Sequence, residues 1–201
     1  MRAANFDFDA GALCLDFANT AEWHASDQPQ EKLNDISDLI AWGEAAGILD
    51  EAQARAEARR AEEAPDAAEA ELRRAIQLRE TIYRIFTANA LEDELAPADL
   101  ARLNEALAQA MARAALRPMA GGFSWSWDAD ERGVALVRWA AARSAAELLT
   151  SDQLDRVRQC ADDRGCGYLF VDTSRNRSRR WCSMKTCGNR AKAKRHYARQ
   201  Q

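Results

Sequence analysis

Alanine occupies 43 of the 201 positions, whereas the chain has only nine glycines and four prolines. Alanine loses no side-chain entropy when it enters a helix, and glycine and proline are the residues that most disrupt one. This balance predicts a mainly α fold with a few short β-strands. A chain of this length can bury one sizeable core and carry one small appended module.

Apolar side chains recur at helical spacing in three segments, over residues 75–86, 100–114 and 137–148. Such spacing places them on one face, so the three helices can share a core. Two further helices are expected, one capped by Asn34 or Ser37 and ending near Gly47, and one running from about Asp50 to a break at Pro65.

Two segments, 6–8 and 123–127, alternate apolar and polar residues and predict short strands. We interpret their aromatic side chains as part of the core. The alternative is a pocket for a flat apolar ligand, the small-molecule effector of a sensor domain. The side chains concerned are Phe6, Phe8, Phe123, Trp125 and Trp127.

The net charge of −4 hides a division along the chain. Residues 1–150 carry −12 and residues 151–201 carry +8, and the segment 173–201 has ten Lys and Arg and no acid. This bias favours a polyanionic partner over ordinary surface mixing. We therefore expect a helical domain over 1–150 and a basic module over 151–201, each with its own core.

The first twelve residues do not resemble a secretory signal, and no apolar run is long enough to span a membrane. We expect a cytoplasmic protein, in which thiols stay reduced.

Four of the five cysteines lie in the last 42 residues, as Cys160, Cys166, Cys182 and Cys187. Two close pairs separated by a longer loop suit four thiolates converging on one tetrahedral zinc ion. All four positions are filled by protein, so the zinc would be structural and not catalytic. A module this small also needs a staple in order to fold. The alternatives are free thiols or disulfides.

The segment 168–190 resembles the CGNR zinc-finger family, which is named for the motif Cys187-Gly188-Asn189-Arg190. The segment 13–20, LCLDFANT, resembles the start of the Ala-rich ABATE domain that accompanies this finger. The resemblance implies that the four cysteines above bind zinc. It also implies a bacterial transcription regulator that binds DNA.

The residues agree with a nucleic-acid partner. Segment 184–200 predicts a helix with cations on most sides, suited to a major groove, and the loop before it carries arginines suited to phosphates. The candidate contacts are Arg175, Arg177, Arg179 and Arg180 in the loop, and Arg190, Lys192, Lys194, Arg195 and Arg199 on the helix.

Five other side chains receive structural interpretations. Trp181 is expected in the small core of the module, with stacking on a base as the alternative. Asp172 is expected as an acceptor for the backbone of Thr173 or Ser174. Asn189 is expected as a brace of the metal-binding turn, with contact to adenine as the alternative. The remaining two are Cys14, expected as a buried hydrophobic residue, and His24, expected on the surface.

No nucleotide-binding glycine loop, serine nucleophile elbow or HExxH helix is present in the sequence, and no catalytic residue is assigned. The leading hypothesis is a DNA-binding transcriptional regulator with one structural zinc ion and no membrane association. The second is a zinc-stapled adaptor that binds an acidic protein or RNA, and the third is an enzyme with a pocket in the N-terminal domain. The oligomeric state stays open.

Overall fold

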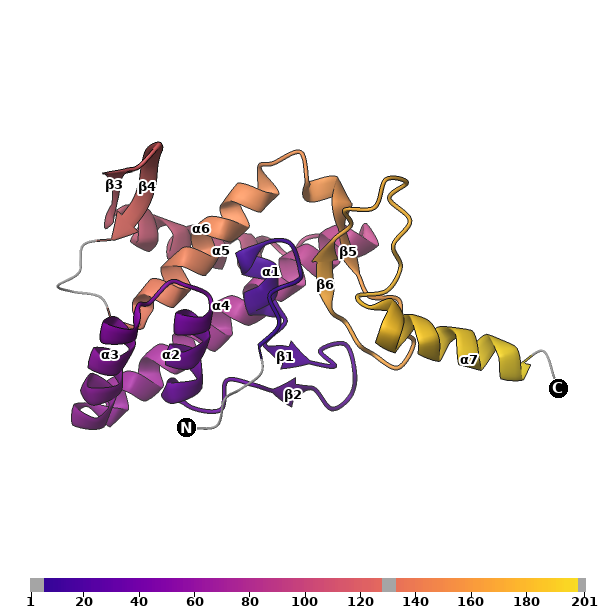
Figure 1. The fold of residues 1–201 in the computed structure, drawn as a ribbon, viewed down its shortest axis with the longest axis horizontal. Coiled ribbons are helices and arrows are strands. Elements are labelled where there is room, and N and C mark those ends of the chain that lie inside the picture. Colours follow the sequence, from indigo (N-terminus) through magenta and orange to yellow (C-terminus); the bar gives the residue numbers. More distant parts are fainter. Residues whose placement is uncertain (1–5, 128–132, 199–201) are drawn as a thin grey trace.

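A computed structural model describes residues 6–127 and 133–198 (Figure 1). The fold is mainly α, as predicted, with three two-stranded antiparallel sheets in the described part of the chain. The elements are α1 (Leu13–Ala18), β1 (Ala21–Glu22), β2 (Gln30–Glu31), α2 (Ile36–Ala45), α3 (Glu51–Glu63), α4 (Pro65–Leu91), α5 (Pro97–Met111), β3 (Ala114–Met119), β4 (Gly122–Trp127), α6 (Ala135–Leu149), β5 (Val157–Gln159), β6 (Leu169–Val171) and α7 (Asn189–Ala198).

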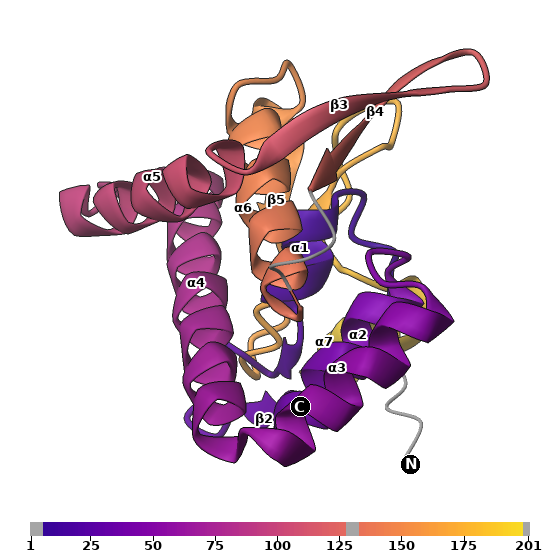
Figure 2. The same cartoon turned by 90° about the vertical axis from the view of Figure 1, so that its left-hand side faces the viewer.

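The long helix α4 packs against α1, α5 and α6, and Figure 2 shows α5 crossing one end of it. The predicted inner stripe of α4, from Ala75 to Phe86, is buried, as is that of α6 from Val137 to Leu148 apart from the partly exposed Ser144. In α5 the prediction was only partly right, because Leu100 and Met111 are 40% and 41% exposed. The helix is rotated so that its smaller alanines, not these larger side chains, face the core beside Leu103.

The ends of the helices follow local hydrogen bonding. Asp35, not Asn34 or Ser37, caps α2, and its carboxylate accepts from two backbone N–H groups. The start predicted at about Asp50 is confirmed, because Asp50 is the N-cap of α3, where it forms a capping box with Gln53. Pro65 is the first residue of α4, where its missing N–H costs no hydrogen bond.

The strand predicted at 123–127 is confirmed as part of β4, which pairs with β3. The strand predicted at 6–8 is wrong, because residues 6–9 form no regular secondary structure. The Phe8 ring instead lies 5.8 Å from the ring of Trp42.

The aromatic side chains of β4 do not form a core with the N-terminal segment. Figure 2 shows the β3–β4 hairpin reaching out from the helices, and Phe123 near its tip is 73% exposed. Only the base of the hairpin is anchored, because the Trp127 indole packs against the core and donates to the Ala110 carbonyl over 2.9 Å. Among the described residues, neither the shared core expected for these aromatic side chains nor the alternative, a pocket between them, is therefore present.

The β5–β6 hairpin joins the C-terminal module to the helical core. Val157, Leu169 and Val171 are buried in the same cluster as the helices, whereas Phe170 between them packs with the cysteines. Successive residues of a strand face opposite sides, so β6 contributes to both clusters at once. The expectation of fully separate cores was wrong for this reason.

Candidate metal centre

The four predicted cysteines meet at one point. Cys160 directly follows β5, and Cys166 lies in the loop before β6. Cys182 lies two residues before a π-helical turn, Met184–Gly188, and Cys187 lies within that turn. Their sulfur atoms all lie within 4.8 Å of one another, and Cys182 Sγ is 3.7 Å from Cys166 Sγ and 3.5 Å from Cys187 Sγ. A tetrahedron of zinc–sulfur bonds has edges of about 3.8 Å. All four are free thiols, so the cluster fits one structural zinc ion.

The electrostatics of the cluster also favour a divalent cation. Hydrogen bonds from the thiols of Cys166 and Cys182 lower the pKa of Cys160, so one thiolate forms readily. The hydrogen bond to that thiolate raises the pKa of Cys166 to about 12 and raises that of Cys182, and burial raises the pKa of Cys187. Further deprotonation would bring like charges together, and a bound zinc ion removes that repulsion.

An arginine from α7 supports the centre from outside. Arg190 Nη2 lies 2.8 Å from Cys187 Sγ, and the same guanidinium donates to Asp162 Oδ2 from Nε over 2.9 Å and from Nη2 over 2.7 Å. Asp162 is buried, and although burial alone would raise its pKa, the bond from Arg190 holds it below its ordinary value. Arg190 was predicted as a nucleic-acid contact, and the structure places it at the metal centre.

Comparison with known families agrees with this arrangement. Residues 11–152 match the ABATE family, described as "Putative stress-induced transcription regulator", and residues 156–200 match the CGNR zinc finger. The chain belongs to the ABATE family. Both descriptions are of regulatory or zinc-finger proteins and not of enzymes. A search of curated proteins found no match.

A second predicted contact of the CGNR finger, Arg179, is also engaged within the module. Its guanidinium lies 4.3 Å from the centre of the Phe170 ring, and it donates to the carbonyls of Trp181, over 3.1 Å, and Cys182. Arg179 therefore fixes the backbone around a zinc ligand.

The remaining predicted contacts that the structure describes lie on the surface of the finger. Arg177 and Lys194 form ion pairs with Asp155 and Asp163. The guanidinium groups of Arg180 and Arg195 lie 5.4 and 5.9 Å from the centre of the Trp181 ring. Arg175 and Lys192 are exposed and have no ion-pair partner among the residues that the structure describes, and Arg199 lies outside those residues.

The structural interpretations near the CGNR finger are confirmed. Asp172 is fully buried and accepts from the backbone of Ser174 over 2.8 Å, and also from that of Arg179 over 2.9 Å. Asn189 donates from Nδ2 to the Lys185 carbonyl over 3.2 Å, which braces the turn. Trp181 packs against the cysteine cluster.

Two glycines let the loop after β1 and helix α4 approach the finger closely. Gly165 and Gly167 have φ values of +85° and +67°. A Cβ on Gly165 would lie 2.6 Å from Ser26 Cα, and one on Gly167 would lie 2.5 Å from the Tyr83 hydroxyl. Both positions therefore require glycine for conformation and for space.

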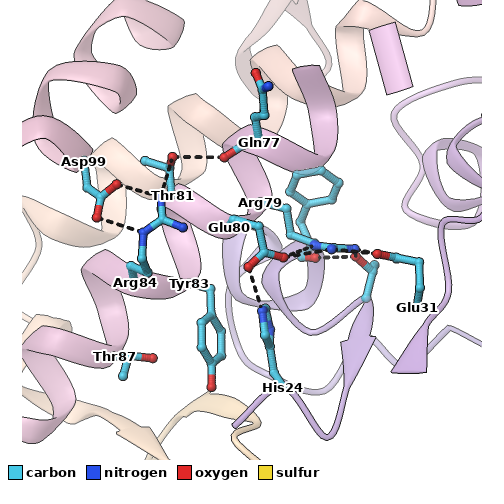
Figure 3. Close-up of polar contacts among 12 residues, drawn as sticks. His24, Glu31, Gln77, Arg79, Glu80, Thr81, Tyr83, Arg84, Thr87 and Asp99 are labelled. Atoms are coloured by element: carbon cyan, nitrogen blue, oxygen red, sulfur yellow. Dashed lines mark hydrogen bonds and ion pairs between the residues drawn. The ribbon is translucent and has the colours of Figure 1, made fainter. Parts of the chain in front are cut away.

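His24 is not the surface residue that the sequence suggested. Its side chain is only 8% exposed, its ring stacks on Tyr83 at 3.5 Å, and its Nε2 lies 2.9 Å from Glu80 Oε2 (Figure 3). Burial alone would raise the pKa of Glu80, but His24 and then Arg79 lower it to about 2. No local pattern could predict this contact, because the partners lie 56 residues apart.

The last cysteine, Cys14, is fully buried away from the metal centre. Burial raises the pKa of its thiol to about 12, as expected for an inert core residue.

Among the described residues, no helix has both the length and the hydropathy needed to cross a membrane.

Proposed function

We propose that this chain is a cytoplasmic, DNA-binding transcriptional regulator of a bacterium that contacts duplex DNA with its CGNR finger. The family description supports regulation. A zinc ion with four protein ligands has no open coordination position at which it could catalyse a reaction. On this proposal the ABATE helices are the regulatory domain, over 1–150, and the finger is the output module, over 151–201.

The character of α7 is the observation that carries the proposal. None of its residues is buried, and Figure 1 shows the helix extending away from the rest of the fold. A ten-residue helix is about 15 Å long and about 10–12 Å in diameter with its side chains, so it can lie in a major groove about 12 Å wide. A helix that contributes nothing to the core yet is fixed to a zinc site is well suited to present side chains to a partner.

The charges of the finger also favour a polyanion. Arg175 and Lys192 are exposed without an ion-pair partner among the described residues, and the partners of Arg177 and Lys194 are themselves exposed carboxylates. Exposed ion pairs are worth little, so phosphates can replace them at small cost. The acidic region 1–150 repels DNA and so orients the finger towards it.

Sequencing the nucleic acid that co-purifies with the zinc-loaded protein tests the proposal. We expect duplex DNA enriched in defined sites, and loss of that enrichment in Cys182→Ser, which lacks a zinc ligand. Recovery of RNA, or of an acidic protein without nucleic acid, would contradict the proposal and favour the zinc-stapled adaptor. Recovery of neither would leave an enzyme as the alternative to pursue.

A further inference from the structure

A cavity of about 250 Å³ lies where the ABATE helices meet the finger. Asp16 of α1 and Trp42 of α2 line it from the N-terminal side. Tyr168 and Arg190 line it from the finger, together with three of the four zinc ligands, all but Cys160. The cavity is therefore bounded by both parts of the chain.

One carboxylate in this wall lacks a full set of partners. Asp16 is only 7% exposed, and its Oδ1 accepts from the Ala10 N–H over 3.0 Å. No described residue donates to its Oδ2 or forms an ion pair with it. Burial raises its pKa to about 6, so the group is still mostly charged at neutral pH. A buried charge without a counter-ion is costly and calls for an explanation.

The cations in the wall do not supply that counter-ion. Arg190 is engaged by Asp162 over 2.7 Å, and Lys32 by Glu22 over 2.6 Å. Asp7, also in the wall, has no cation within ion-pair distance among the described residues. The charge left uncompensated in the cavity is therefore negative, which excludes an anionic ligand.

Aromatic side chains supply most of the apolar wall. They are Phe6, Trp23, Trp42 and Tyr168. The Trp42 indole is fully buried, and its Nε1 has no acceptor among the described residues. Aromatic faces beside an unpaired carboxylate are the combination that recognises organic cations.

We infer that this cavity is a binding site for a small organic cation, an amine with an aromatic or apolar body. The ammonium group pairs with Asp16, and the body packs among the aromatic side chains. The inference that the amine is a regulatory effector rests on the proposed function, whereas binding itself does not.

The position of the site explains how occupancy reaches the DNA-facing helix. Thr186 of the π-helical turn and Arg190 of α7 both line the cavity. A ligand there contacts the segment that holds α7 and the segment 6–23 at once. If the protein binds the amine more tightly in one position of α7 than in another, amine binding changes the affinity for DNA. DNA binding then changes the affinity for the amine by the same factor.

Calorimetric titration of the zinc-loaded full chain tests the site. Phenethylamine and tetramethylammonium are the cationic probes, and phenethyl alcohol and phenylacetate are the neutral and anionic controls. We expect a cationic probe to bind with one-to-one stoichiometry, at least about tenfold more tightly than either control. Equal affinities for all probes, or no saturation by either cation, would overturn the inference.

Variants assign the binding to Asp16. Asp16→Asn keeps an acceptor for the Ala10 N–H and removes the charge, so amine affinity should fall about tenfold or more. The matched control is Asp27→Asn, an exposed carboxylate outside the cavity, which should bind as the wild type does. If Asp16→Asn does not fold by circular dichroism, Asp7→Asn should weaken binding instead. Unchanged affinity in the folded Asp16→Asn protein, or in Asp7→Asn where that substitute is needed, contradicts the site.

Repeating the DNA titration with and without saturating phenethylamine separates the two proposals. Amine binding without any DNA binding keeps the cavity assignment and rejects the regulator. DNA binding by a protein that binds no amine keeps the regulator and rejects the cavity assignment.

Discussion

The side-chain amide of Asn19 satisfies both backbone hydrogen-bonding groups of Leu169. Its Nδ2 donates to the Leu169 carbonyl over 2.8 Å, and its Oδ1 accepts from the Leu169 N–H over 2.9 Å. Both residues are buried. The end of α1 thus acts as the missing neighbour of β6 and ties the ABATE helices to the finger.

Replacing Asn19 with Ala should destabilise the protein by about 2 to 4 kcal/mol, because two buried backbone groups lose their partners. The urea midpoint of unfolding, followed by circular dichroism, measures this loss. Asn104→Ala on the exposed face of α5 is the control and should change stability by less than about 0.5 kcal/mol. Equal effects of the two substitutions would show that the Asn19 contact is unimportant.

The Asp16→Asn protein should be more stable than the wild type at neutral pH, by about 1 to 3 kcal/mol, because the substitution removes a buried charge. The folded-state pKa of Asp16 is raised to about 6, so its favourable contribution is complete below the ordinary carboxyl pKa and is lost as the pH rises through about 6. The difference between the two proteins should therefore shrink as the pH falls from neutral to about 4. Thermal unfolding across this range tests the sign, and a difference that grows on acidification contradicts it.

Much of this architecture follows from local sequence. Helical spacing located α4 and α6, and the Cys187-Gly188-Asn189-Arg190 motif located the metal centre, because each depends on residues close in the chain. Contacts between distant segments gave no such signal. Asn19 meets Leu169 across 150 residues, and His24 meets Glu80 across 56.

The spacing of apolar residues also could not predict which of them pack against another part of the protein. The alternation at 123–127 is the same whether a hairpin packs on a core or projects from it, and Phe123 projects. In the same way, counting arginines could not separate Arg179 and Arg190, which brace the zinc centre, from the exposed Arg175.

Cys182→Ser should release the zinc, since three remaining thiolates leave the tetrahedral site incomplete. Cys14→Ser should keep one zinc per chain, because Cys14 lies in the helical core. Metal analysis of both proteins, purified under reducing conditions, gives the comparison. Full zinc content in Cys182→Ser, or loss of zinc in Cys14→Ser, would show that the assigned ligands are wrong.

Chelation of the zinc should loosen the finger unevenly. The turn around Cys187 and helix α7 contribute nothing to the helical core, so their amides should exchange rapidly once the metal is gone. The amides of Leu169 and Val171 should stay protected, because their partners are Asn19 and the Ala10 carbonyl. Hydrogen exchange measured by mass spectrometry before and after chelation distinguishes these segments. Simultaneous loss of protection in both would mean that the zinc holds the whole β5–β6 hairpin.

The salt dependence of DNA affinity is the most direct test of the central claim that the finger surface grips DNA. Each phosphate contact contributes about 0.9 to the slope of log affinity against log salt concentration. The Arg175→Ala/Lys192→Ala protein should therefore have a slope about 1.5 to 2 shallower than the wild type. Arg55→Ala/Arg59→Ala, which removes two exposed cations from α3, should leave the slope unchanged. Equal slopes for the finger variant and the wild type would contradict the account.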